Sequence, residues 1–134
     1  MTQTLTHSET TKAQFSLERA TIAFGLIGIA VVHIMDLPDK WEEVRYLGIA
    51  YVGLIIAATV LAERIIKVGS RLDLLASFGL AASVILGFVI NRTVGMPNAM
   101  GDIGNWWEPL GLVSLFIEGL VVYQTGKLLL NSSK

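Results

Sequence analysis

Residues 20–35 read ATIAFGLIGIAVVHIM, and this stretch decides the fold. Its centre, GLIGIAVV at 25–32, has no polar side chain on any face of a helix, and GLIIAATVL at 53–61 is nearly as apolar. A surface helix of a soluble protein needs a polar face, whereas a helix that is hydrophobic all round lies in a large core or in a bilayer. A chain of 134 residues is too short to bury several such helices in a soluble core. The two runs therefore predict transmembrane helices.

Four apolar runs follow one another along the chain, at 20–35, 46–62, 74–90 and 110–123, the last extending to 130. With its amphipathic flanks, each run approaches the ~20 residues that cross ~30 Å of hydrocarbon. The hydrophobic content of 53% and the mean hydropathy of +0.62 agree with a membrane protein. We predict an all-α bundle of four transmembrane helices in a single domain, 1–134, with helices over 20–37, 42–67, 72–90 and 105–130.

The segment 1–19 is mostly polar, and we predict that it is a tail outside the membrane. No small-residue cleavage site follows the first apolar run, which is therefore expected to be an uncleaved helix and not a signal peptide. Cysteine is absent, which excludes disulfides, thiolate metal sites and thiol redox chemistry.

Charged residues predict the orientation. The tail 1–19, the loop 63–73 and the C-terminal tail share one side and hold seven Lys or Arg residues, against three on the other side. Basic segments stay in the cytoplasm, so both termini are predicted to be cytoplasmic. The other side carries six carboxylates against three bases, a net charge of −3, which argues against a nucleic-acid partner. The basic loop 63–73 more simply meets anionic lipid.

Two ionisable residues stand at the outer end of the first helix. His33 and Asp36 are spaced i, i+3, so they lie on one face of the helix. An imidazole beside a carboxylate can ligate a metal ion, pass a proton, or form a simple hydrogen-bonded pair where Asp-Leu-Pro at 36–38 turns the chain away. The spacing leaves these alternatives open.

The segment 91–111, NRTVGMPNAMGDIGNWWEPLG, predicts a long structured loop on the outer side, between the third and fourth helices. Pro109 suits a first helical turn, and the paired tryptophans suit the aromatic belt of a membrane protein. These roles do not explain the density of polar side chains, and long loops of this kind are commonly functional. The polar residues in question are Arg92, Asp102, Asn105 and Glu108.

We predict that this loop folds over the outer ends of helices one and four. Arg92 would pair with Asp102 or Glu108, and the loop would complete a polar site with His33 and Asp36, whose buried polar groups need partners. If the site binds a metal ion, His33 with Asp36, Asp102 or Glu108 forms a nitrogen-and-oxygen ligand set that favours zinc or another divalent ion. If it binds none, the same groups form a salt-bridged lid.

Other metal centres find less support in the sequence. Methionines near the outer side slightly favour copper, since thioethers suit Cu(I). His33 is the one histidine in an apolar run and His7 lies in the polar tail, which excludes a bis-histidine haem within one chain.

Glu118 lies ten positions after Glu108, hence about 15 Å deeper along the fourth helix and near the middle of the bilayer. A charge at that depth costs several kcal/mol, so the side chain should face the bundle and be protonated or paired. Ser114, one turn above, is a candidate partner. A neutral hydrogen-bonded acid and a proton relay or cation site are both open interpretations.

The segment 91–111 also resembles a loop-and-helix pattern of small, functionally uncharacterised bacterial four-helix integral membrane proteins. This resemblance covers part of the chain, and it implies the fold and the topology without an activity.

Three classes of function are compatible with these features. The favoured class is a non-catalytic integral membrane subunit or accessory protein, whose extracytoplasmic polar pocket binds a metal ion, a lipid headgroup or a partner chain. The second is a small proton- or cation-coupled transporter that uses Glu118 and assembles as an oligomer. An enzyme is less favoured because the sequence offers no Cys, no His-rich cluster and no phosphate loop. Expected partners are the bilayer and other membrane subunits or further copies of the chain.

Overall fold

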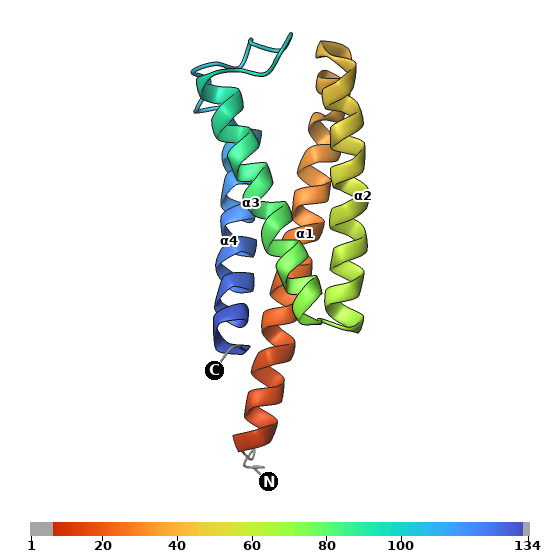
Figure 1. The fold of residues 1–134 in the computed structure, drawn as a ribbon, viewed down its shortest axis with the longest axis vertical. Coiled ribbons are helices and arrows are strands. Elements are labelled where there is room, and N and C mark those ends of the chain that lie inside the picture. The colour runs from red at the N-terminus through yellow and green to blue at the C-terminus, as the bar shows by residue number, and fades with distance from the viewer. Residues whose placement is uncertain (1–6, 133–134) are drawn as a thin grey trace.

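The computed structural model describes residues 7–132, and every regular element within this range is an α-helix (Figure 1). The helices are α1 (His7–Glu43), α2 (Arg45–Lys67), α3 (Arg71–Thr93) and α4 (Pro109–Ser132). Each contains a segment long and apolar enough to cross a membrane, namely Ser16–Glu43, Arg45–Lys67, Arg71–Thr93 and Pro109–Asn131. The prediction of four helices that can span a membrane is therefore confirmed by their length and composition. The fold is that of a multi-pass membrane protein.

Two helical hairpins make the bundle. α1 and α2 are joined through Val44, and α3 and α4 are joined by the segment 94–108. Figure 1 shows α3 crossing in front of α1, while the first turn of α1 and the last turn of α4 lie away from the α3–α4 connection. We call the end that holds 94–108 the loop end, and the opposite end, with the α2–α3 connection at 68–70, the turn end.

Glycines set the close approach of α1 to α4. A Cβ added at Gly25 would lie 2.6 Å from Val121 Cγ2, and one at Gly28 would lie 3.2 Å from Ile117. Small residues allow transmembrane helices to pack this tightly. The contacts also fix the relative heights of the two helices: with a rise of 1.5 Å per residue, His33 lies roughly 8 Å nearer the loop end than Glu118.

The apolar core extends from the level of Ile29 and Ala30 toward the turn end. Ile22, Leu26, Val121 and Ala81 are among its fully buried members, contributed by α1, α4 and α3. Large apolar side chains also point outward, as with Phe24 at 81% exposure. Outward apolar side chains and an apolar interior together are what a lipid environment favours.

Ion pairs and caps fasten the turn end. Arg19 donates to the carbonyl oxygens of Ile65 and Ile66, both at 2.8 Å. Ser70 and Asp73 form a capping box at the start of α3, and Arg64 Nε lies 2.6 Å from Asp73 Oδ1. The α2–α3 connection is thus a short, well-anchored turn.

The first helix differs from its predicted limits of 20–37. α1 begins at His7, within the segment expected to be a polar tail, and it continues through Pro38 to Glu43. Proline removes one backbone hydrogen bond, but membrane helices tolerate it where neighbours restrain the chain. Here Asp36 and Lys40, on either side of Pro38, are each held by another segment. The expected turn at 36–38 is therefore wrong, and the turn lies at Val44.

The fourth helix begins later than predicted. α4 starts at Pro109 and not at 105, because Pro109 occupies the first turn and the carbonyl of Glu108 accepts the hydrogen bond from Leu112 N. Asn105 and both tryptophans consequently belong to the loop. α2 and α3 match their predicted ranges of 42–67 and 72–90 to within three residues at each end.

Candidate functional site

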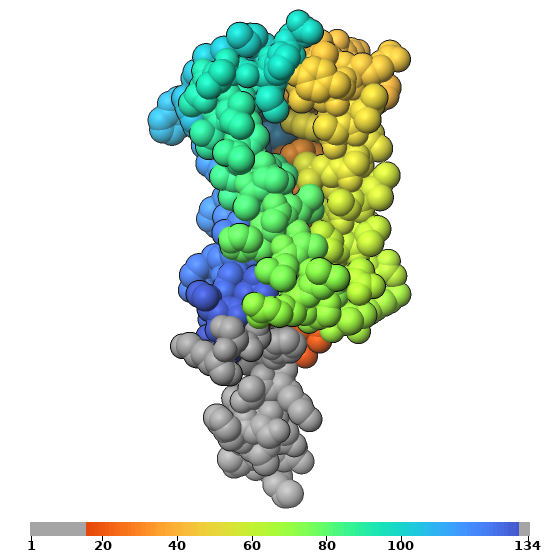
Figure 2. All heavy atoms as spheres, in the orientation of Figure 1, coloured from red at the N-terminus to blue at the C-terminus, as the bar shows by residue number. Residues whose placement is uncertain are grey.

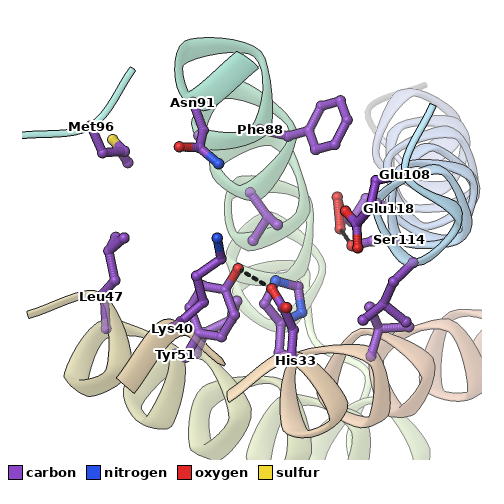
Figure 3. Close-up of a pocket in the computed structure, with 18 of the residues that line it drawn as sticks. His33, Lys40, Leu47, Tyr51, Phe88, Asn91, Met96, Glu108, Ser114 and Glu118 are labelled. Carbon is purple, nitrogen blue, oxygen red and sulfur yellow. Dashed lines mark hydrogen bonds between the residues drawn. The ribbon is translucent and has the colours of Figure 1, made fainter. Parts of the chain in front are cut away.

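A cavity of about 200 Å³ lies between the four helices at the loop end (Figure 3). Polar side chains of every helix and of the loop reach it. They are His33, Asp36, Lys40, Tyr51, Asn91, Arg92, Glu108, Ser114 and Glu118.

The α2–α3 side of the cavity is mainly apolar. Leu47 and Leu54 of α2 face Val84 and Phe88 of α3 across it. Figure 2 shows the surface hollowed between the upper parts of α2 and α3, with atoms of α1 and α4 visible at depth. The cavity therefore opens sideways between two membrane-spanning helices.

Asp102 holds the loop end together. Its Oδ2 atom accepts a hydrogen bond from Lys40 Nζ at 2.6 Å and from Asn91 Nδ2 at 3.3 Å, and it lies 3.2 Å from Arg92 Nη1. Burial opposes ionisation of Asp102, but the hydrogen bonds and charges of Lys40, Asn91 and Arg92 outweigh it and lower its pKa below the usual value. Asp102 is therefore ionised at neutral pH.

Arg92 extends this network to α4. Its Nη2 donates to Glu108 Oε2 at 2.8 Å, and its guanidinium carbon stands 4.7 Å from the centre of the Phe88 ring. We refer to Lys40, Asp102, Arg92 and Glu108 together as the clasp. The predicted pairing of Arg92 with Asp102 or Glu108 is confirmed, since Arg92 contacts both.

Two glycines with left-handed backbone allow the loop to fold back toward Arg92. Gly95 and Gly104 have φ of +89° and +80°, and Gly104 N donates to the carbonyl of Arg92 at 2.7 Å. The Tyr46 hydroxyl of α2 donates to the carbonyl of Pro97. The loop thus contacts α1 and α2 as well as the two helices that it connects. The sequence predicted contacts with helices one and four, and the contact with α2 is additional.

His33 and Asp36 meet through Tyr51 and not directly. His33 Nδ1 lies 2.7 Å from the carbonyl oxygen of Ile29, within its own helix. The Tyr51 hydroxyl donates to Asp36 Oδ2 at 3.0 Å, and the Tyr51 ring packs edge-on against the His33 ring with centroids 4.8 Å apart. The two residues share a cavity, but the direct hydrogen-bonded pair considered above is not formed.

Glu118 forms the deepest polar part of the cavity. Its side chain is 1% exposed, and Ser114 Oγ donates to its Oε2 atom, in agreement with the predicted partner (Figure 3). No Lys, Arg or His side chain among the described residues pairs with it.

Buried polar atoms without a hydrogen-bond partner concentrate at this cavity. Among the described residues four such side-chain atoms occur, and three belong to cavity residues: Asn91 Oδ1, Arg92 Nε and Glu118 Oε1. Such atoms are rare in folded proteins because each costs about 1–3 kcal/mol. These three atoms are available for hydrogen bonds to a molecule bound in the cavity.

The predicted metal ligands do not assemble into a metal centre. Among the residues whose side chains the structure describes, 16–131, no group of three or more His, Asp or Glu side chains is arranged to hold a metal ion. Asp102 and Glu108 lie in the clasp against Arg92. Asn105 is exposed and does not line the cavity, and its backbone N–H donates to the carbonyl of Asp102.

Three functional candidates are additions to the predicted set: Lys40, Tyr51 and Asn91. Lys40 follows Asp36 by four positions and so lies on the same helical face, a signal that the sequence offered. Tyr51 is the one polar-tipped side chain in the apolar run 46–62 that reaches the cavity. The role of Asn91 could not be predicted, because it depends on which face of α3 is turned toward the loop.

Fold and site together define an α-helical, multi-pass membrane protein with a laterally open cavity at the loop end of its bundle. No protein-family profile, curated protein or solved structure matches the chain.

Proposed function

We propose that the protein is a non-catalytic integral membrane protein that binds a small amphipathic molecule in the cavity at its loop end. One observation carries the proposal: the cavity has an apolar wall where it opens between α2 and α3 and a polar wall opposite, with buried unpartnered polar atoms. Ligand sites commonly combine apolar surface with a few placed polar groups. A molecule of lipid-like character could enter between the two helices without leaving the bilayer.

Of the three ligand classes expected from the sequence, a lipid-like molecule is favoured. A bound zinc or copper ion finds less support, because the described residues offer no assembled ligand set. A partner chain or a second copy of this chain would contact the exposed residues of the helices and not the cavity, so it is compatible with a lipid-like ligand.

We place both termini in the cytoplasm and the cavity on the extracytoplasmic side. Seven basic residues in the segments of the turn end and tails, against three at the loop end, support this orientation. The resemblance of 91–111 to small bacterial four-helix membrane proteins agrees with it. The cavity would then collect ligands from the outer leaflet.

Purification in a mild detergent, followed by native mass spectrometry, tests the proposal. We expect a bound amphipathic molecule to co-purify at about one per chain. Gly87 lines the cavity, and a Cβ added there would meet no atom within 4 Å, so Gly87→Leu should fill the space and reduce the bound fraction. Gly79→Leu is the matched control, because it lies on the same helix, is equally open and does not line the cavity. Equal ligand content in both variants would count against the proposal.

A second candidate, a small proton- or cation-coupled transporter, rests on Glu118. The side chain is buried at the inner limit of a cavity that reaches the loop end, and apolar core residues lie beyond it toward the turn end. A carboxylic acid in that position can exchange a proton for another cation. Uptake or efflux by reconstituted vesicles that is lost in Glu118→Gln would support this candidate.

A further inference from the structure

We infer that the ligand of this cavity is an amphipathic cation, an organic amine or quaternary ammonium compound whose charge is held by Glu118 and whose apolar part lies on the α2–α3 wall. This inference rests on the proposed function and names the class of its ligand. It follows from the charges around the cavity, from the burial of Glu118 and from the position of the opening.

The two cationic side chains of the cavity, Lys40 and Arg92, already pair with carboxylates, although Arg92 Nε has no hydrogen-bond partner. Lys40 Nζ contacts Glu43 Oε2 at 2.9 Å and Asp102 Oδ2 at 2.6 Å. Arg92 contacts Asp102 and Glu108 and lies over the Phe88 ring. An anionic headgroup would have to compete with these carboxylates, at a cost in the stability of the clasp.

The acidic side chains are not matched in the same way. Asp36 and Glu118 accept hydrogen bonds from hydroxyl groups, those of Tyr51 and Ser114, and no ion pair within 4.0 Å reaches either carboxyl group among the described residues. The clasp itself holds three carboxylates with Glu43 against two cations. The cavity therefore offers two carboxyl groups that no cation of the protein pairs with, whereas its cations already pair with carboxylates.

Glu118 is the better of the two acids for holding a charged ligand. Asp36 is partly exposed and already accepts the Tyr51 hydroxyl, whereas Glu118 is 1% exposed and its Oε1 atom has no partner. An ion pair strengthens as water is excluded, provided that both charges are satisfied. A protonated amine beside Oε1 would donate a hydrogen bond to an atom that is otherwise buried and unpaired, whereas a quaternary ammonium, which has no N–H, would interact with it by charge alone.

The remainder of the cavity suits an apolar substituent more than a hydrated metal ion. Leu47, Leu54 and Val84 provide surface without ligand atoms, and the Tyr51 ring adds an aromatic wall. A metal ion needs several oxygen or nitrogen ligands around one point, which the described residues do not assemble. An alkyl or aryl ammonium compound would place its charge beside Glu118 and its apolar group against the α2–α3 wall.

Two water-soluble probes of similar size and opposite charge test the inference: benzyltrimethylammonium and phenylmethanesulfonate. The protein is placed in nanodiscs of zwitterionic lipid, and binding is measured by isothermal titration calorimetry against empty nanodiscs. We expect saturable binding of the ammonium probe at one site per chain, with the sulfonate at least tenfold weaker. Glu118→Gln should weaken ammonium binding at least tenfold.

Matched variants separate the role of Glu118 from folding. Glu118→Asp keeps the charge and should retain more ammonium binding than Glu118→Gln, while thermal unfolding verifies that both variants fold. Glu63→Gln removes an exposed carboxylate at the turn end, where Glu63 pairs with Lys67 at 2.6 Å, and should leave binding unchanged.

Each contrary result has a separate meaning. Preference for the sulfonate would overturn the cationic ligand but leave the amphiphile-binding function intact. Ammonium binding that survives Glu118→Gln and is lost in Asp36→Asn would overturn the assignment to Glu118. Failure of both probes, together with no co-purifying amphiphile, would remove the proposed function as well.

Discussion

Lys40 Nζ and Asp102 Oδ2 lie 2.6 Å apart, so an ammonium group on α1 and a loop carboxylate 62 positions further along the chain form one ion pair. The same oxygen also lies near Asn91 and Arg92 of α3. A single carboxylate atom thereby links the first hairpin to the second at the loop end. Since α2 and α3 stand apart there, this link maintains the shape of the cavity.

Asp102→Asn is expected to destabilise the protein by about 1–3 kcal/mol, because the amide keeps the size of the side chain but removes the charge that Lys40 and Arg92 share, leaving Lys40 with Glu43 alone and Arg92 with Glu108 alone. Thermal unfolding of the purified protein in a mild non-ionic detergent measures the change. Glu63→Gln is the control: both partners of the Glu63–Lys67 pair are more than 60% exposed, so its loss should not change the unfolding temperature measurably. Equal effects in the two variants would mean that the clasp contributes nothing beyond an ordinary surface pair.

The clasp should also make stability depend on acid pH. The pKa of Asp102 is lowered in the folded protein, whereas an unfolded Asp titrates near ~3.9. Its stabilising effect is therefore complete above the unfolded pKa and disappears as pH falls through the folded pKa. We expect wild type to lose its stability advantage over Asp102→Asn below about pH 4, and to keep it unchanged from about pH 5 to 7. Unfolding of both proteins across this range, measured in parallel, cancels contributions from the other carboxylates.

Gly48→Ala tests the tight connection between α1 and α2. A Cβ at Gly48 would lie 2.4 Å from Trp41 Cε3 and 3.0 Å from Trp41 Cα, so the two helices would have to separate. We expect a loss of about 1–3 kcal/mol in thermal or denaturant unfolding. Gly53→Ala, five residues along the same helix, meets no atom within 4 Å and should be neutral or stabilising by up to ~1 kcal/mol. If both variants lost a similar amount of stability, the cause would be the replacement of glycine in this helix in general and not the contact with Trp41.

Features that depend on one segment at a time were predictable from the sequence. The apolar runs located four helices because a lipid-exposed helix must be apolar all round. The depth of Glu118 followed from the rise per residue, and its contact with Ser114 followed from their spacing of four positions. Arg92 was matched with Asp102 and Glu108 because few other charges lie in that part of the chain.

Features that depend on how helices face one another were not predictable. Tyr51 stands between His33 and Asp36 because of the relative rotation of α1 and α2, which no pattern within either helix determines. Proline usually ends or kinks a helix, so Pro38 predicted the end of the first helix. In the structure α1 continues through Pro38, and Asp36 and Lys40 on either side of it are held by distant residues. The expected metal ligands come from two distant segments, and their assembly depended on how the loop folds; in the structure Asp102 and Glu108 are held by Arg92.

Glu118 is expected to tolerate replacement by its neutral counterpart. In Glu118→Gln the side chain keeps its size, and its amide oxygen can still accept the Ser114 hydroxyl, so stability should change by less than ~1 kcal/mol. Glu118→Ala should cost about 1–3 kcal/mol, because it leaves a space and a buried hydroxyl without its acceptor. Thermal unfolding distinguishes the two variants. Marked destabilisation by Gln would indicate that the ionised acid itself holds the fold together.

The orientation in the membrane can be tested by single cysteines, since the chain contains none of its own. Residues 98 and 69 are central to the two connections but unsuitable for this purpose. Asn98 and Gly69 both have left-handed backbone, with φ of 59° and 64°, and a Cβ at Gly69 would lie 2.4 Å from Arg19 Nε. Gly101, where an added Cβ meets no atom within 4 Å, and Val68, which is 54% exposed, avoid these conflicts.

We expect an impermeant maleimide applied to intact cells to label Gly101→Cys and not Val68→Cys, because the basic segments of the turn end should remain in the cytoplasm. After the membrane is permeabilised, both cysteines should react, which verifies that each is accessible in the folded protein. Labelling of Val68→Cys alone in intact cells would reverse the orientation and place the cavity on the cytoplasmic side. Labelling of both in intact cells would mean that the segment between them, α3, does not separate two sides of a membrane.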